Sequence, residues 1–222
     1  MIGAGSMGRR HIANLLSLGC AVSVYDVSAV QVPDGATRAK RSGMDGFDAV
    51  VIATPWNSHY AYAKRAATKQ IPFFVEKPLG TVGELPQWRA LAARRRLPVN
   101  QVGYNLRFHP KVATMRRHVP RAIRGEFHVQ CDMTSWPGAS YGPCELECSH
   151  ELDLALSFGA DGFDVSRSWR GSYLFDYGAW RVFIDGRSAA YLRDWTVYDF
   201  ATEAGCRFTS PEYLGDEMYQ AE

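Results

Sequence analysis

The chain has 222 residues, and 46% of them are hydrophobic, which is enough apolar surface for one large domain or two modest ones. The 25 basic and 23 acidic residues leave a formal net charge of +2, which excludes a strong electrostatic pull toward nucleic acid or an anionic membrane. No apolar run reaches the roughly 18 residues that span a bilayer, and no signal peptide is recognisable, so we expect a cytoplasmic protein without membrane contact.

The cysteines predict neither disulfides nor a metal site. There are five, an odd number without the dense spacing of a secreted framework, so reduced thiols are expected. Cys144, Cys148 and His150 resemble the start of a zinc site, but a fourth ligand at the usual paired spacing is missing. We therefore expect no metal.

The first half of the chain alternates short apolar runs with helical patterns. The opening stretch, MIGAGSMGRRHIANL, places a glycine turn before a helix that should end near Gly19. Only Met1 and Ile2 precede this turn, where a strand of about five or six residues is expected, so the sequence suggests either a trimmed chain or a minimal one. Residues 28–46 are expected to form a loop. Further strands are expected within residues 20–26, 47–55, 71–78 and 97–105, and helices within 57–69 and 81–96.

From about Asn105 the pattern changes to alternating apolar and polar residues with turn signals, which is typical of antiparallel strands. A helical segment, SHELDLALSFG, interrupts them. The predicted fold is therefore α/β, with an N-terminal Rossmann-type doubly wound parallel sheet in residues 1–104. An α+β domain with an open, mainly antiparallel sheet should follow in residues 105–222. The strands of this sheet are expected within residues 125–133, 163–171, 180–186 and 188–200.

The glycine turn matches the G-x-G-x-x-G pattern of a dinucleotide-binding site. The first glycine makes a tight turn, the second lets backbone N–H groups approach a pyrophosphate, and the third permits close packing of helix and strand. A glycine turn without a ligand is the alternative. The residues of this turn that are predicted to bind the cofactor are Gly3, Gly5, Ser6, Met7 and Gly8.

Asp26 strengthens this interpretation because it ends the next predicted strand. A carboxylate at that place accepts hydrogen bonds from the adenosine ribose hydroxyls and repels a 2′-phosphate. NAD is therefore favoured as the cofactor, although Arg9 and Arg10 leave NADP open.

A second motif, Glu76–Lys77–Pro78, follows a predicted strand at the carboxyl edge of the sheet, where open α/β sheets bind their ligands. A lysine there can donate a hydrogen bond to a substrate oxygen. From these three residues alone, a surface lysine in a turn is the better explanation of the pattern.

Five segments in this order resemble the Gfo/Idh/MocA family of oxidoreductases: GAGSMGRRH, ATPWNSH, VEKPLG, GYNLRFHP and SHELDLALSFG. The resemblance spans residues 1 to about 160. It implies hydride transfer between nicotinamide and a hydroxyl-bearing carbon of a sugar, nucleotide sugar or cyclitol. It also implies a homo-oligomer, a dimer or tetramer, assembled through the C-terminal sheet.

The resemblance also implies roles for individual residues. Lys77 would be the catalytic lysine, and His150 the histidine that exchanges a proton with the reacting oxygen. Residues expected to border the cofactor are Thr54, Pro55, His59, Glu76 and Lys77. Residues expected to contact the substrate are Asn105, Arg107, Trp136, Tyr141, Glu147 and Asp153.

Purely structural roles are the alternative explanation for several of these side chains. His59 and His150 would each also be explained as histidines at a helix start, and the two aromatic residues as packing residues under a loop. Asp153 lies three residues after His150, on one helix face, so its carboxylate would reach back toward the imidazole or the substrate.

Two rival functions stand beside a dehydrogenase. A non-catalytic dinucleotide-binding sensor or regulatory protein of the same fold would keep the glycine turn, but it would not need both Lys77 and His150. A methyltransferase that uses S-adenosylmethionine shares a glycine-rich turn, but it leaves the Glu-Lys-Pro motif unexplained.

Overall fold

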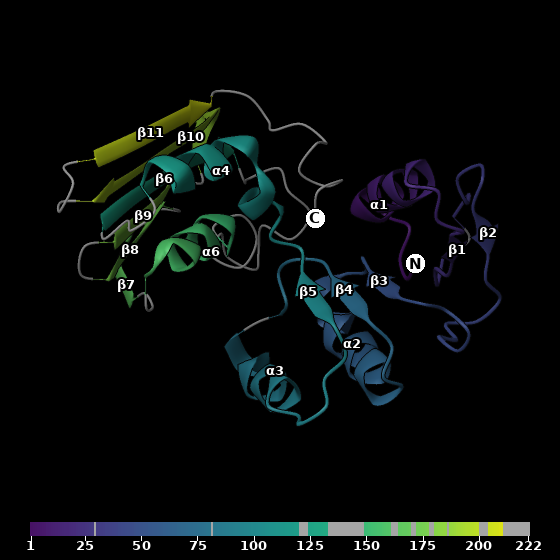
Figure 1. Cartoon of the computed structure of the whole chain (residues 1–222). Coiled ribbons are helices and arrows are strands. Elements are labelled where there is room, and N and C mark those ends of the chain that lie inside the picture. Colours follow the sequence, from purple (N-terminus) through teal and green to yellow (C-terminus); the bar gives the residue numbers. More distant parts are fainter. Residues whose placement is uncertain are drawn as a thin grey trace. The chain divides into compact units, whose positions relative to one another are not determined.

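The computed structural model describes residues 1–28, 30–80, 82–119, 124–132, 149–160, 164–169, 172–177, 180–185, 187–199 and 204–210. The chain divides into two compact units, Met1–Gly103 (unit 1) and Tyr104–Glu222 (unit 2). Figure 1 follows the chain through both.

Unit 1 is built on a parallel sheet whose centre is the start of the chain. Ile2 forms parallel bridges with Tyr25 on one side and Ile52 on the other, which joins the β1–β2 pair to the β3–β4–β5 sheet. The resulting order, β2–β1–Ile2–β3–β4–β5, is that of a Rossmann sheet and confirms the predicted fold class. The strands are β1 (Ser23–Val24), β2 (Thr37–Arg38), β3 (Val50–Ile52), β4 (Phe73–Val75) and β5 (Asn100–Val102).

The helices of unit 1 follow the predicted segments. They are α1 (Ser6–Ser17), η1 (Trp56–Ser58), α2 (His59–Thr68), η2 (Val82–Glu84) and α3 (Leu85–Ala92), where η marks a 3₁₀ helix. The end of α1 is as expected, because Gly19 has a φ of +80° and its N–H donates to the Leu16 carbonyl over 3.0 Å. The Cys20 N–H donates to the Leu15 carbonyl over 2.9 Å, which completes a Schellman motif.

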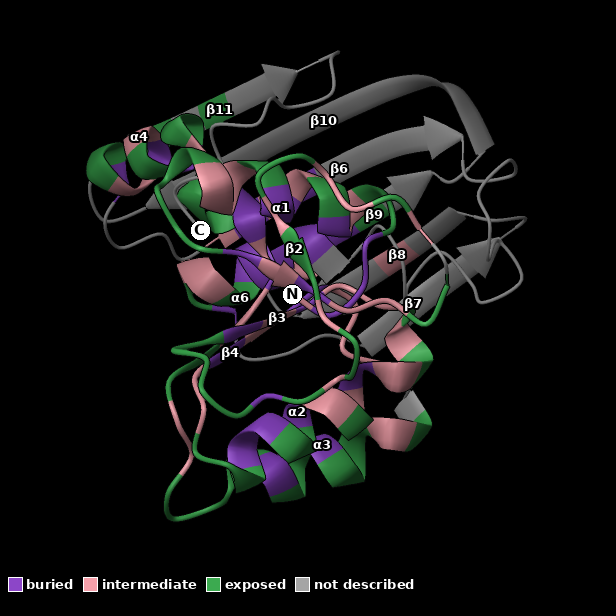
Figure 2. Ribbon diagram, turned by 90° about the vertical axis from the view of Figure 1, so that its right-hand side faces the viewer, coloured by how far each residue is buried: buried purple, intermediate pink, exposed green. Residues whose placement is uncertain are grey.

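Apolar side chains cover both faces of this sheet. On one face, Ile12 of α1 packs in a cluster with Val22 and Val24. Ala63 and Ala67 of α2 belong to a second cluster that also contains Ile52 and Val75 of the strands. In Figure 2, α1 and α2 each carry buried residues on one side and exposed residues on the other. Helices on two faces of a parallel sheet make the doubly wound arrangement.

Unit 2 contains a six-stranded sheet with the order β11–β10–β6–β9–β8–β7. Neighbouring strands are antiparallel except for β6 and β9, so the sheet is mainly antiparallel as predicted. Helix α4 contacts β11, and α6 contacts β6 and β9 (Figure 1). The elements are η3 (Asn105–Phe108), α4 (Pro110–His118), β6 (Arg124–Asp132), α6 (Ser149–Phe158), β7 (Asp164–Trp169), β8 (Ser172–Tyr177), β9 (Trp180–Asp185), β10 (Arg187–Asp199) and β11 (Ala204–Ser210).

The structure contains three strands that were not predicted from the sequence. The prediction of loop throughout residues 28–46 was wrong at β2, where the Thr37 N–H donates to the Val22 carbonyl over 2.9 Å. Pairing with a distant strand, rather than a local pattern, forms this element. Strands β8 and β11 were not predicted. Within the segment 81–96 that was expected to be helical, α3 itself begins at Leu85, and residue 81 lies outside the described residues.

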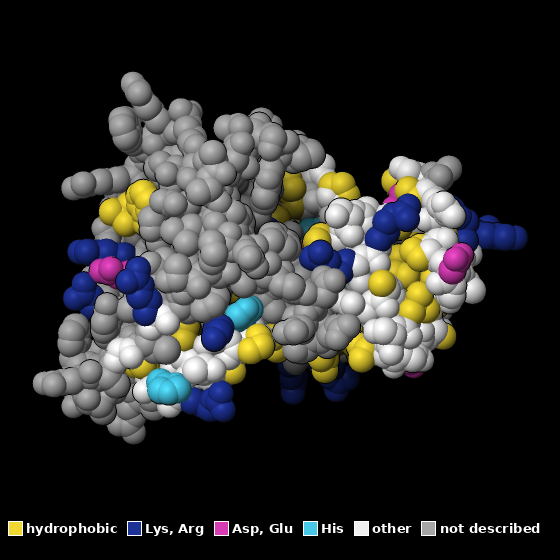
Figure 3. Space-filling model, turned by 90° about the horizontal axis from the view of Figure 1, so that it is seen from above, with side chains coloured by type: hydrophobic (Ala, Val, Ile, Leu, Met, Phe, Trp, Pro, Cys, Tyr) yellow, Lys and Arg dark blue, Asp and Glu magenta, His cyan; other side chains and the backbone are white. Residues whose placement is uncertain are grey.

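The surface carries charges of both signs. On the face drawn in Figure 3, acidic side chains lie beside basic ones, with apolar side chains visible among them. Within the described ranges, no helix combines the length and apolar character that crossing a membrane requires.

The packing of the glycine turn gives a stability prediction. A Cβ atom on Gly8 would lie 2.3 Å from the Gly3 carbonyl oxygen. This oxygen belongs to the backbone, so no side-chain rotation can relieve the clash. We expect Gly8→Ala to lower the free energy of unfolding of unit 1 by about 1–3 kcal/mol, measured by urea titration. Gly5→Ala is the control, because a Cβ there meets nothing within 4 Å and its φ is −67°. Equal stability of the two variants would contradict the prediction.

Candidate functional site

A pocket of about 300 Å³ opens in unit 1 beside the glycine turn. It is formed by three segments: the turn itself, the residues that follow β1, and the residues that follow β3. Five of the predicted cofactor-binding residues line it together, namely Gly3, Gly5, Asp26, Thr54 and Pro55. The other lining residues are Ile2, Tyr25, Val27, Ser28, Val30, Ala53 and Tyr62.

Asp26 is fixed to the glycine turn by hydrogen bonds. Its Oδ2 accepts the backbone N–H of Ala4 over 2.7 Å, and its Oδ1 accepts the N–H of Ser28 over 2.8 Å. An ionised carboxylate has about four acceptor positions, so these two donors leave capacity for hydroxyl groups of a ligand. The carboxylate is therefore held ready at the pocket wall.

The N-terminus of α1 suits an anion. Gly5 is the N-cap residue, so no side chain caps the first turn, and no acidic residue occupies that turn. The first N–H groups of a helix have no partner within the helix, and the helix dipole favours negative charge there. With open space around Gly5, the backbone offers the approach that a phosphate needs. Ser6 and Met7 begin the same helix.

His59 links two of the predicted segments. It is 1% exposed, and its Nε2 lies 2.7 Å from the Thr54 carbonyl oxygen while its Nδ1 lies 2.9 Å from the Pro78 carbonyl oxygen. Burial lowers the pKa of this imidazole below its ordinary value, and the two carbonyl contacts oppose the shift. A neutral ring carries one N–H, so it donates a hydrogen bond to one of the two carbonyl groups at a time. The ring thus lies between the two turns and contacts both.

Lys77 lies in the turn that follows β4, at the carboxyl end of the sheet, and its bond to Pro78 is cis. Its backbone N–H donates to Glu76 Oε2 over 3.0 Å. Glu76 is 6% exposed, and its Oε1 lies 2.6 Å from His11 Nε2. The motif therefore combines a half-buried lysine with a buried carboxylate.

In unit 2, His150 is the second residue of α6 and is 7% exposed. Its ring meets that of Tyr104 edge to face, with centroids 6.1 Å apart. Asn105 is also buried, and its Oδ1 has no hydrogen-bond partner among the residues that the structure describes. Unit 2 thus contains a buried amide on η3 and a buried histidine on α6.

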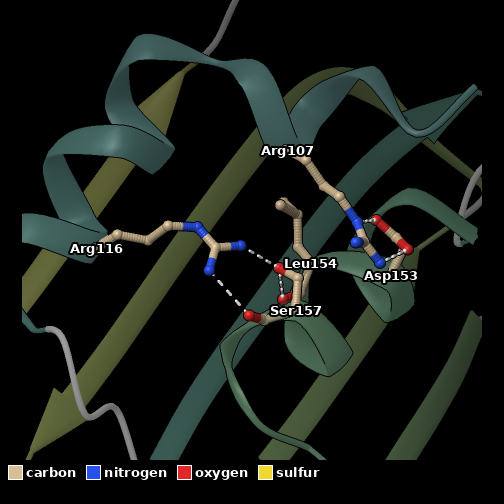
Figure 4. A network of polar contacts seen from close by, with 5 residues as sticks. All are labelled: Arg107, Arg116, Asp153, Leu154 and Ser157. Carbon is tan, nitrogen blue, oxygen red and sulfur yellow. Dashed lines mark hydrogen bonds and ion pairs between the residues drawn. The ribbon is translucent and has the colours of Figure 1, made fainter. Parts of the chain in front are cut away.

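Arg107 and Asp153 form an ion pair with two hydrogen bonds (Figure 4). Arg107 Nε donates to Asp153 Oδ2 over 2.6 Å, and a terminal nitrogen of the same guanidinium donates to Oδ1 over 2.5 Å. Burial raises the pKa of the Asp153 carboxyl above its ordinary value, and Arg107 opposes the rise. Both carboxylate oxygens are thus engaged by Arg107, whereas the sequence suggested a reach toward His150 or the substrate.

Arg116 makes a parallel attachment to α6. It donates to the Ser157 carbonyl over 2.9 Å and to Ser157 Oγ over 2.6 Å, while Ser157 Oγ donates to the Leu154 carbonyl over 2.6 Å. Figure 4 shows Arg107 and Arg116 reaching α6 from the preceding segments. The helix that carries His150 is therefore anchored by two arginines.

Three predicted substrate contacts, Trp136, Tyr141 and Glu147, lie outside the described residues. His11 was not among the predicted site residues, and the structure places it against Glu76. A signal was present, because His11 falls with Gly8 and Ile12 on the buried face of α1. Tyr25 and Tyr62 of the pocket wall were also missed.

Ligands of open α/β sheets bind beyond the carboxyl ends of the strands, where the strand order reverses. The pocket of unit 1 lies at that place, between the segments that follow β1 and β3. By fold and pocket, unit 1 belongs to the class of dinucleotide-binding Rossmann domains.

Comparison with known proteins supports the resemblance seen in the sequence. Residues 1–104 match the Gfo/Idh/MocA model described as "Oxidoreductase family, NAD-binding Rossmann fold".

Three relatives illustrate the similarity. The rhizopine catabolism protein MocA of Rhizobium meliloti is 27% identical over 143 residues, covering 58% of this chain and 44% of that protein. Inositol 2-dehydrogenase 1 of Saccharopolyspora erythraea is 25% identical over 230 residues, covering 92% and 64%. UDP-N-acetylglucosamine 3-dehydrogenase of Acidithiobacillus ferrooxidans is 25% identical over 183 residues, covering 74% and 55%.

A solved structure of a UDP-N-acetylglucosamine 3-dehydrogenase from the same organism superposes with a TM-score of 0.75 at 21% identity, covering 100% of this chain and 84% of the other. This likeness supports the fold. The chain spans between 44% and 64% of the lengths of the three curated relatives.

The pKa of His59 gives a prediction of pH dependence. Because burial lowers this pKa from 6.5, the unfolded chain binds more protons than the folded one as the pH falls below about 6.5. Stability should therefore fall with pH there, by at most about 1.4 kcal/mol per pH unit for this group. Urea titrations at several pH values should show a shallower slope for His59→Asn than for the wild type. Identical slopes would exclude the assignment to His59.

The ion pair in unit 2 gives a prediction of stability. Arg107→Met leaves the Asp153 carboxylate, whose side chain is 8% exposed, without its guanidinium. We expect a loss of about 2–4 kcal/mol in the unfolding free energy of unit 2, measured by thermal and urea denaturation. The control is Arg117→Met on the exposed side of α4, which should change stability little. A loss no greater than that of the control would show that the pair contributes nothing.

Proposed function

We propose that the protein is an NAD-dependent oxidoreductase that transfers a hydride between nicotinamide and a hydroxyl-bearing carbon of a sugar, nucleotide sugar or cyclitol. The observation that carries the proposal is the match of residues 1–104 to the NAD-binding oxidoreductase family, with its pocket beside the glycine turn. The presence of Lys77 at the carboxyl end of β4 favours an enzyme over a non-catalytic sensor.

The residues around the pocket fit a dinucleotide. The N-terminus of α1 and the space at Gly5 suit the pyrophosphate, with Ser6, Met7 and Gly8 continuing the helix. Asp26 would accept hydrogen bonds from the ribose hydroxyls, and as a carboxylate it favours NAD over the more negative NADP. Thr54 and Pro55 would border the cofactor, with His59 behind Thr54.

Lys77 and His150 are the proposed catalytic residues. A bound oxidised nicotinamide would supply the hydride acceptor for the alcohol carbon. That carbon releases its hydride only as its hydroxyl group loses a proton, and a neutral imidazole at His150 can accept this proton. Lys77 would donate a hydrogen bond to the same oxygen and stabilise its developing negative charge. In the reverse direction, His150 would return the proton to the carbonyl oxygen.

The anchoring of α6 supports the role of His150. Arg107 and Arg116 hold this helix from η3 and α4, so the imidazole is attached to a rigid element within unit 2. Asn105, Arg107 and Asp153 are proposed to line the substrate side of His150, with Trp136, Tyr141 and Glu147 from the adjoining segment. The buried Asn105 amide suits a hydroxyl-rich ligand, because a buried polar group without a partner costs free energy until a ligand supplies one.

The substrate class rests on the relatives. Two of them are named for oxidation of inositol and of UDP-N-acetylglucosamine, both of which carry secondary hydroxyl groups. We propose that this chain acts on a compound of that kind. The protein is further proposed to be a homo-oligomer, a dimer or tetramer, through its C-terminal sheet, where Phe183 of β9 is 37% exposed. A reducing compartment such as the cytoplasm suits the exposed thiol of Cys20.

The test is a spectrophotometric screen of NADH formation with a panel of inositols, sugars and nucleotide sugars. We expect turnover with at least one, and a fall in kcat/KM of about 10²–10⁴ in Lys77→Met and in His150→Gln. Lys69→Met is the matched control, because Lys69 lies on the surface in an ion pair with Asp45. Its activity should equal that of the wild type.

Two results would count against the enzyme. Binding of NADH without turnover on any member of the panel, in either direction, would favour the sensor. Turnover that survives in Lys77→Met would remove the lysine from the mechanism.

A further inference from the structure

A buried carboxylate and imidazole lie beneath the turn that carries Lys77. His11 Nε2 and Glu76 Oε1 are 2.6 Å apart although the residues are 65 positions apart in the chain. The two residues are 7% and 6% exposed. Burying a carboxylate costs free energy unless hydrogen bonds compensate it. An apolar pair of the same size would therefore stabilise the fold more than this pair does.

The second oxygen of the same carboxylate is directed to Lys77. Glu76 Oε2 accepts the Lys77 N–H over 3.0 Å, so the side chain folds back over the peptide bond that follows it. The Glu76 N–H in turn donates to the Ile52 carbonyl over 2.9 Å. The backbone on both sides of Glu76 is therefore fixed, on one side by β3 and on the other by its own carboxylate.

The surroundings leave the carboxylate little freedom. A Cβ atom on Gly103 would lie 3.1 Å from Glu76 Oε2, so the end of β5 closes one side. The His11 ring meets the Phe74 ring edge-on, with centroids 5.0 Å apart. His11 itself lies on the buried face of α1, the helix whose N-terminus faces the pocket.

The turn is held from its other end as well. His59 Nδ1 lies 2.9 Å from the Pro78 carbonyl oxygen, one residue beyond Lys77. Lys77 is thus flanked by two residues that buried histidines contact, one from α1 and one from the start of α2.

We propose that His11 and Glu76 are positioning residues for Lys77. His11 donates its Nε2 proton to the carboxylate and holds it in place. The carboxylate then holds the Lys77 N–H, which sets the direction in which the lysine side chain leaves the turn. The proposal rests on the proposed function, in which the amine of Lys77 binds the reacting oxygen, and it connects the phosphate-binding helix to that amine through two side chains.

The kinetic test compares His11→Leu, which removes the donor, with His11→Gln, whose amide N–H can replace it. A displacement of about 1 Å at a reacting group costs about 10²-fold in rate. We expect kcat of His11→Leu to fall about 10–100-fold, while the dissociation constant of NADH, measured by fluorescence titration, changes by less than about threefold. His11→Gln should recover most of kcat. His118→Leu, at an exposed histidine on α4, is the matched control.

A second measurement needs no turnover. Hydrogen exchange of the Lys77 amide, followed by NMR, should be slow in the wild type and in His11→Gln, and faster in His11→Leu and Glu76→Gln. Glutamine at position 76 lacks the second acceptor oxygen. Thermal denaturation of each variant shows whether it remains folded under the assay conditions, and the amide measurement is made where it does.

The outcomes separate the two proposals. In one outcome the wild type turns over substrate and Lys77→Met does not, but His11→Leu keeps the wild-type kcat or the wild-type exchange rate of the Lys77 amide. The positioning role is then overturned, and the proposed oxidoreductase function stands. If NADH binding falls in step with kcat in His11→Leu, the histidine merely supports α1, and the positioning role is also overturned. If the wild type turns over no substrate, the proposed function fails by itself, and the positioning role in catalysis falls with it.

Discussion

The pairing of Ile2 at the centre of the parallel sheet is the constraint on which the structure of unit 1 depends. Ile2 donates its N–H to the Val51 carbonyl over 2.8 Å and accepts from Ala53 over 2.8 Å, while Gly3 donates to the Tyr25 carbonyl over 2.9 Å. These bonds align the residues after β1 and β3 with the glycine turn. Because parallel strands end at a common edge, Asp26, Thr54 and Gly5 come to line one pocket although they are distant in the chain. Ile2 therefore joins the two parts of the parallel sheet, because both of its neighbours pair with it.

Local chemistry explains which parts were predictable from the sequence. The glycine turn, Asp26 at a strand end and the Glu-Lys-Pro motif each carry their signal within a few residues, and the structure has the corresponding turn, pocket wall and strand end. Strand β2 could not be predicted, because two exposed residues carry no period and form a strand only by pairing with β1. The parallel pairing of β6 with β9 could not be predicted for the same reason, because strand pairing depends on two distant segments and not on either one alone.

Partners of buried polar groups were equally hidden. The helical period shows that His11 faces the core, but not that a carboxylate from the end of β4 meets it there. Likewise, the spacing of His150 and Asp153 places both on one helix face, whereas the guanidinium that engages Asp153 comes from η3. A buried charge requires a partner, yet the sequence does not say which of several distant residues supplies it.

The distribution of buried polar side chains is a physical argument for function. Among the described residues, the buried polar and charged side chains are His11, His59, Glu76, Asn105, His150, Glu151 and Asp153. All of them lie in the glycine-turn helix, the segments after β3 and β4, η3 or the start of α6. Elsewhere the described core is apolar, as stability alone would favour, since a buried polar group contributes less than an apolar one unless its hydrogen bonds are complete. The described part of the fold thus concentrates its energetically costly groups in the segments that carry the proposed cofactor-binding and catalytic residues.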